Sequence, residues 1–154
     1  MKHNAFFPDP ASRNWIHVIW TTRDAMPRLA PRKRDKLLIY LRKYCEKGDI
    51  YLDVAHAMSE HIHLLILLRP RQSLASLVDG LKLATERYLK EVELWESAYH
   101  AYSVSAAQLP YLRRQIRRQD KIHLRISLEQ ELWELNPGGM RSECVCIAQV
   151  SGRE

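Results

Sequence analysis

The sequence predicts an α+β domain in which about four antiparallel strands are packed against helices. Apolar residues change repeatedly between a period of two, typical of strands, and a period near 3.6, typical of helices. The resulting order is strand, helix, strand, strand, helix, strand and then a further helix, and 154 residues suit one domain. This order predicts a ferredoxin-like sheet with helices on one face plus a C-terminal helix.

The first half of the chain predicts three strands and one helix. β-branched and aromatic residues mark the first strand, two prolines mark the loop after it, and a glycine ends the helix. The expected segments are Trp15–Thr21 (strand), Thr22–Pro31 (loop), Arg32–Gly48 (helix), Ile50–Met58 (strand) and Glu60–Leu68 (strand). Strict alternation places Ile50, Leu52 and Val54 on one face of their strand.

The second half predicts two long helices, one strand and one short helix. Ser73 is the expected N-cap of the first helix, and Pro110 is tolerated because it falls in the first turn of the second. The expected segments are Leu74–Tyr88 (helix), Tyr99–Ser105 (strand), Gln108–Leu124 (helix) and Leu128–Leu135 (helix). Residues 14–135 are expected to form the domain, between an N-terminal extension at 1–13 and a C-terminal tail at 136–154.

The charge balance points to an anionic partner. Lys and Arg number 24 against 18 Asp and Glu, which gives a net charge of +6 and a pI near 9.4. The longest aliphatic run, Leu64–Leu68, is far too short to span a membrane, and the N-terminus lacks the apolar segment of a signal peptide. Cys45, Cys144 and Cys146 are odd in number, so no disulfide framework is expected and a cytoplasmic location is favoured.

The third predicted strand carries two histidines at alternate positions. His61 and His63 point to one face, with Cα atoms about 6–7 Å apart. Two neutral imidazoles at this separation can bind one divalent cation together with further ligands. The alternative is two half-buried histidines whose nitrogens bond to carbonyls or water. The remaining histidines are scattered and are expected at the surface or in packing: His17, His56, His100 and His123. Of these, His56 could approach the pair from the adjacent strand.

Three segments of the chain carry a resemblance to a known family. They are WIHVIWTTRDAMPRL near the N-terminus, SEHIHLLILL around the paired histidines, and AYSVS followed by QIRRQDKIH. Jointly these segments resemble the HUH-superfamily single-tyrosine transposases of simple insertion sequences and their REP-associated relatives. The resemblance covers roughly residues 14–132, which is most of the chain.

The resemblance implies a metal-dependent enzyme that cuts and rejoins single-stranded DNA. In this family Mg²⁺ or Mn²⁺ sits on the two histidines and a glutamine of the active-site helix, which correspond here to His61, His63 and Gln119. A tyrosine one turn before the glutamine attacks the phosphate and forms a 5′-phosphotyrosine link. Members recognise hairpin DNA and act as dimers, so the implied partners are single-stranded or hairpin DNA and a second copy of the chain.

The chain departs from this pattern at the nucleophile. Gln115 stands four residues before Gln119, where the family has its tyrosine, and an amide is not a usable nucleophile. Tyr111 lies one turn earlier, and Tyr111 with Gln115 repeats the family spacing. Either the helix works one turn out of register, with Tyr111 as nucleophile and Gln115 as ligand, or the chain has lost its nucleophile and retains DNA binding. The unchanged spacing from AYSVS to Gln119 favours the second alternative.

Basic residues concentrate on the helix that is expected to face the paired histidines. Acids are nearly absent among them, which favours contact with DNA phosphates over an ordinary solvated face. The expected contacts are Arg113, Arg114, Arg117, Arg118 and Lys121, together with Lys82, which matches a basic position of the family's other helix. The acids are expected to collect elsewhere, notably at Glu129, Glu131 and Glu134.

Overall fold

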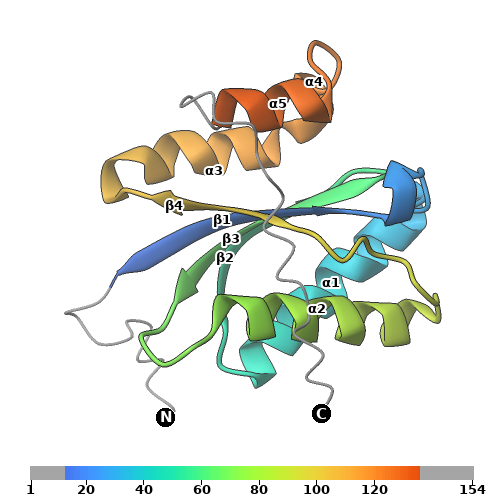
Figure 1. The fold of residues 1–154 in the computed structure, drawn as a ribbon, viewed down its shortest axis with the longest axis horizontal. Coiled ribbons are helices and arrows are strands. Elements are labelled where there is room, and N and C mark those ends of the chain that lie inside the picture. The colour runs from blue at the N-terminus through green and yellow to red at the C-terminus, as the bar shows by residue number, and fades with distance from the viewer. Residues whose placement is uncertain (1–12, 136–154) are drawn as a thin grey trace, which may run out of the picture.

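The computed structural model describes residues 13–135, which form an antiparallel sheet with helices on both faces (Figure 1). The strands are β1 (Asn14–Thr21), β2 (Tyr51–Ala57), β3 (His61–Leu68) and β4 (His100–Val104). They lie in the order β2-β3-β1-β4, and each neighbouring pair is antiparallel. The predicted ferredoxin-like α+β fold is confirmed. The predicted tail and all but the last residue of the predicted extension lie outside the described residues.

Two layers of helices enclose the sheet. On one face lie α1 (Pro31–Lys47) and α2 (Leu74–Leu89), and on the other lie α3 (Leu109–Arg117), α4 (Gln119–Ile122) and α5 (Leu128–Leu135) (Figure 1). Single 3-10 turns follow β1 (η1, Arg23–Ala25) and β4 (η2, Ala106–Gln108). Ser73 caps α2 as predicted, because its hydroxyl accepts a hydrogen bond from the Ser76 N–H. Within residues 13–135, none of the helices has the length and apolar character needed to cross a membrane.

Strand β3 is buried on both faces because both helical layers cover it. Its residues Ile62, Leu64 and Ile66 belong to the core under α1 and α2. The alternate residues Leu65 and Leu67 belong to a second core with one stripe of α3, formed by Leu109, Leu112 and Ile116. His61 and His63 lie on the same face of β3 as Leu65 and Leu67, so the paired histidines lie beneath the α3–α5 layer.

A β-bulge in β2 corrects the predicted face of Val54. The pairing with β3 shifts between Leu52, which is opposite Ile66, and Val54, which is opposite Leu65. The extra residue, Asp53, reverses the alternation, so Val54 packs in the core under α3, whereas Leu52 packs in the core under α1 and α2. The same reversal places His56 opposite His63, on the face of the paired histidines.

The last predicted long helix is broken rather than continuous. Arg118 has φ −109° and ψ 17°, outside the helical range, and separates α3 from α4. The predicted helix over Gln108–Leu124 was therefore wrong in its continuity at Arg118 and in its end, since α4 stops at Ile122. The break redirects the chain so that the segment after α3 folds back over the sheet and leads into α5 (Figure 1).

Candidate metal centre

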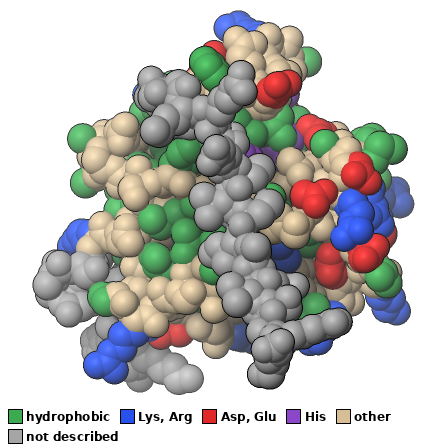
Figure 2. Space-filling model, in the orientation of Figure 1, with side chains coloured by type: hydrophobic (Ala, Val, Ile, Leu, Met, Phe, Trp, Pro, Cys, Tyr) green, Lys and Arg blue, Asp and Glu red, His purple; other side chains and the backbone are tan. Residues whose placement is uncertain are grey.

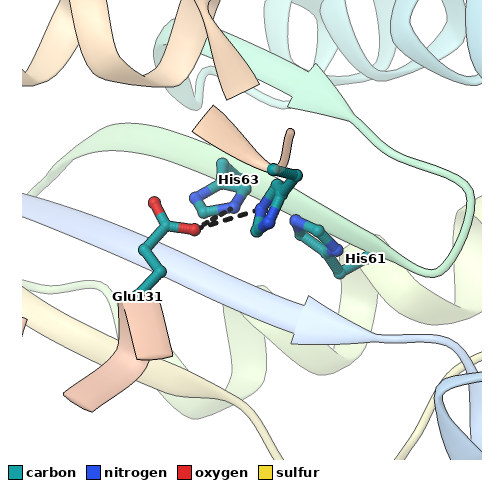
Figure 3. Close-up of side chains that lie close together, drawn as sticks. His61, His63 and Glu131 are labelled. Carbon is teal, nitrogen blue, oxygen red and sulfur yellow. Dashed lines mark ion pairs between the residues drawn. The ribbon is translucent and has the colours of Figure 1, made fainter. Parts of the chain in front are cut away.

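Four side chains from three segments converge on the α3–α5 side of the sheet. They are His61 and His63 of β3, His123 after α4, and Glu131 of α5, and their donor atoms all lie within 4.8 Å of one another. Glu131 Oε2 lies 3.7 Å from His63 Nε2 and 3.2 Å from His123 Nε2 (Figure 3). In the view of Figure 2, histidine surface shows only as small patches beneath α5. His61 and His63 are fully buried and Glu131 is nearly so, which makes the cluster an interior site beneath the C-terminal helices.

Each of the three imidazoles is fixed through Nδ1. His61 Nδ1 is 2.9 Å from Glu60 Oε1, His63 Nδ1 is 3.0 Å from His17 Nε2, and His123 Nδ1 is 3.1 Å from the Ile126 carbonyl oxygen. The three Nε2 atoms are buried and have no hydrogen-bond partner among the described residues. Metal-bound histidines are held in this way, with one ring nitrogen bonded to an acceptor and the other directed at the ion.

Burial keeps His61 and His63 neutral, together with His17 behind them. Desolvation lowers the pKa of His17 and of His61 to about 4, and it lowers the pKa of His63 well below its ordinary value. A neutral imidazole offers the lone pair that a metal ion requires. Burial raises the pKa of Glu131, because a carboxylate away from water is costly without a cation. These groups would therefore gain from a shared positive ion.

Gln119 lies at the same centre. Its side chain is fully buried, and its Nε2 donates a hydrogen bond of 2.7 Å to Glu131 Oε1. Its Oε1 is buried and has no hydrogen-bond partner among the described residues, as is also true of Glu131 Oε2. The three histidine Nε2 atoms and Glu131 Oε2 thus lie close together without hydrogen-bond partners among the described residues, which is the donor arrangement expected of a cation site. The donor set fits a divalent metal ion.

The sequence prediction missed two residues of this centre. His123 was expected at the surface or in packing, and Glu131 was grouped with acids remote from the histidines, but both belong to the cluster. Both left a signal in the sequence. His123 follows Gln119 by four residues, one helical turn. Glu131 falls at apolar spacing between Leu128 and Leu135, and it is the only buried residue of α5.

The two candidate residues for the nucleophile position lie on α3. Tyr111 is in its first turn, and the side chain is 59% exposed. It lies eight residues before Gln119, about two helical turns, and the break at Arg118 falls between the two residues. Gln115 lies one turn before Gln119 and is half-buried. The structure thus brings Gln119 to the paired histidines, and Tyr111 lies about two turns away along the chain.

The basic residues of α3 and α4 divide into two groups. Arg114, Arg117, Arg118 and Lys121 are exposed to solvent. Arg113 is half-buried, and its Nε donates a 2.6 Å hydrogen bond to Asp53 Oδ2, while its guanidinium lies 5.7 Å from the Trp15 ring centroid. The bulged residue Asp53 therefore anchors α3 to the sheet through Arg113. Four exposed cations remain to contact an anionic partner.

Lys82 lies on the opposite side of the sheet from the paired histidines. It is a buried residue of α2, and its Nζ donates hydrogen bonds to the carbonyl oxygens of Glu96, Ser97 and Ala98 at 2.7, 2.8 and 3.1 Å. An ammonium has three protons, and all three are used. The expected DNA contact by Lys82 does not agree with this arrangement, which instead fastens the loop before β4.

The sheet, the paired histidines of β3 and the basic helix α3 together fit the transposase class that the sequence resembles. The family model described as IS200-like transposase matches residues 11–119, and the chain belongs to this family. Transposases of this kind bind and recombine DNA, so the chain has a transposase-like, DNA-binding function. A search among curated proteins found no significant match.

Two solved structures have a similar fold. One is a candidate transposase from Deinococcus radiodurans R1, with a TM-score of 0.58 and 22% identity over 73% of this chain and 95% of that chain. The other is a REP-associated tyrosine transposase bound to a REP hairpin, with a TM-score of 0.61 and 11% identity over 73% of this chain and 69% of that chain. At these identities the likeness supports the fold alone.

Proposed function

We propose that this chain binds single-stranded or hairpin DNA across α3 and α4, beside a divalent metal ion at His61 and His63. The observation that carries the proposal is the set of four exposed cations on the two helices that cover the paired histidines: Arg114, Arg117, Arg118 and Lys121. Exposed guanidinium and ammonium groups bind the nucleic-acid backbone by displacing its counterions. The REP hairpin bound by one structural neighbour supports a hairpin as the first substrate to test.

Asp120, the acidic residue of α4, does little to repel an anionic partner. Asp120 Oδ2 lies 3.0 Å from His56 Nε2, and Asp120 Oδ1 lies 3.7 Å from Arg34 Nη1. Its charge is thus shared with a cation from α1 and an imidazole from β2. Because Arg113 is occupied by Asp53, the proposed DNA surface has four cations and not the five basic residues that the sequence predicts on this helix.

Strand transfer through Tyr111 is the second candidate function. The observation in its favour is that Tyr111 is exposed and stands four residues before a glutamine. Against it, Gln119 rather than Gln115 meets Glu131, and Tyr111 lies eight residues before Gln119, in the first turn of α3 and on the other side of the break at Arg118. We therefore propose that the chain retains DNA binding and that Tyr111 does not form a phosphotyrosine link.

The metal ion is part of the same proposal. The family resemblance implies Mg²⁺ or Mn²⁺ held by His61, His63 and Gln119. An ion there, when bound, would polarise a phosphate oxygen and stabilise negative charge. A homodimer is likewise implied by the resemblance and stays a prediction.

The test is a binding and cleavage assay with labelled hairpin DNA taken from the genomic flanks of the gene. With Mg²⁺ or Mn²⁺ present, we expect salt-sensitive binding that favours hairpin over blunt duplex DNA, and no covalent adduct on a denaturing gel. Tyr111→Phe should bind as the native chain does, and Tyr88→Phe, an exposed tyrosine on α2, is the matched control. An adduct that is lost in Tyr111→Phe alone would select strand transfer instead. Equal, salt-insensitive affinity for every DNA would refute the proposal.

A further inference from the structure

We infer that the centre is a closed site for an imidazole-preferring ion, Zn²⁺ first of all, whose four ligands are His61, His63, His123 and Glu131. This inference rests on the proposed function only in placing a divalent ion at the paired histidines. It changes the ligand set, because Gln119 becomes a residue that positions Glu131. It also changes the role of the ion, which fastens α5 to the sheet.

The donor atoms favour zinc over magnesium or manganese. Mg²⁺ prefers six oxygen ligands and keeps several waters, whereas imidazole suits zinc and the later transition metals. Three imidazole nitrogens and one carboxylate oxygen form a complete tetrahedral set for Zn²⁺. Structural zinc sites have four protein ligands, whereas catalytic sites have three and leave a position open for water or substrate. With Glu131 as the fourth ligand, no position remains for a DNA phosphate.

Gln119 and Glu60 act as the outer shell of this site. Gln119 Nε2 donates to Glu131 Oε1 at 2.7 Å, which leaves Glu131 Oε2 directed at the Nε2 atoms of His63 and His123. Glu60 accepts from His61 Nδ1 at 2.9 Å, which fixes the tautomer whose Nε2 is free. Such partners orient ligands and are built into metal sites. An amide that donates to a ligand carboxylate is placed to orient that ligand.

The packing of α5 shows what the ion would do for the fold. Glu131 is the only buried residue of this helix, and its Trp133 is 65% exposed. The apolar stripe of α5, Leu128, Leu132 and Leu135, is only half-buried, so apolar contacts hold this helix less firmly than a fully buried stripe would. Glu131 and His123 both follow the segment that the family model matches, which ends at residue 119. The ion therefore joins the segment beyond residue 119 to β3.

The test is metal binding by the full chain after removal of metal with a chelator. Titration calorimetry and metal analysis should give one Zn²⁺ per chain, bound at least 100-fold more tightly than Mn²⁺ or Mg²⁺. Hydrogen exchange should show zinc-dependent protection of residues 123–135. Glu131→Gln and His123→Gln should each weaken Zn²⁺ binding at least tenfold, and Gln119→Ala should weaken it about tenfold through the displaced carboxylate. Glu129→Gln, an exposed acid on the same helix, is the matched control and should change nothing.

The outcomes separate this inference from the proposed function. Binding of Mn²⁺ or Mg²⁺ as tightly as Zn²⁺, unaffected by Glu131→Gln, would overturn the four-ligand site and leave DNA binding with the family ion intact. Absence of any metal binding would overturn the inference while DNA affinity still tests the basic surface. Circular dichroism of each metal-free variant checks that the sheet is folded. Because Glu131→Gln preserves size, a folded variant with unchanged Zn²⁺ affinity would also refute the inference.

Discussion

Removing the exposed arginines of α3 and its C-cap should weaken DNA binding in a salt-dependent way. The variant replaces Arg114, Arg117 and Arg118 with glutamine, which removes three charges at exposed positions. Arg113 is left in place because its bond to Asp53 anchors α3. The change should therefore act on the DNA surface and leave the core beneath α3 intact.

The magnitude follows from counterion release. Each phosphate neutralised contributes about 0.7 on a single strand, and about 0.9 on a duplex stem, to the slope of log affinity against log salt, so three lost contacts should reduce the slope by at least about 2. Between about 50 and 200 mM salt, the DNA affinity of the native chain should therefore fall by a factor about 16 times larger than that of the variant.

Fluorescence anisotropy with a labelled hairpin, repeated over a salt series, measures this slope directly. The matched control replaces Arg42, Lys43 and Lys47 with glutamine, which removes the same charge from exposed positions of α1, on the other face of the sheet. That variant should keep the native slope to within about one contact. An unchanged slope in the α3 variant, or a larger loss in the α1 variant, would refute the placement of DNA on α3 and α4.

Three further predictions follow from individual side chains. Lys82→Met should lower the free energy of unfolding by about 3 kcal/mol, because three carbonyl oxygens lose a charged donor, and should leave DNA affinity unchanged. Urea unfolding tests this against the exposed control Lys43→Met, and lost DNA affinity at native stability would contradict it. Burial raises the pKa of the Cys45 thiol to about 12, so Cys45 should resist alkylation at pH 8 until urea unfolds the chain, as peptide mapping would show. Gln115→Tyr returns a tyrosine to one turn before Gln119. With zinc bound at the closed site, this variant should form no covalent DNA adduct on a denaturing gel, because no DNA phosphate can reach the ion. An adduct formed with zinc bound would contradict the closed site.

Local sequence patterns predicted most of the fold. The two periods of apolar residues gave the strands, and Ser73, Gly48 and Pro110 marked helix ends because capping and proline effects act over a single turn. The pairing of His61 and His63 could also be predicted, since the alternation of a strand alone places them on one face. These features depend on neighbours within a few residues.

The missed features depend on contacts between distant segments. Nothing in the sequence of β2 marks the bulge at Asp53, which is stabilised by Arg113, 60 residues further along. The break at Arg118 likewise could not be predicted, because no proline or glycine lies there. Because that break aims His123 and Glu131 at β3, the complete donor set could be read only from the folded chain.

The most direct test of the account is X-ray absorption at the zinc edge of the loaded protein, which counts the ligands of the ion. The account predicts three imidazoles and one carboxylate oxygen at about 2.0–2.1 Å, with one imidazole lost in His123→Gln. A shell with two imidazoles and several oxygens, unchanged in His123→Gln, would contradict the central claim that His123 and Glu131 complete the site on β3.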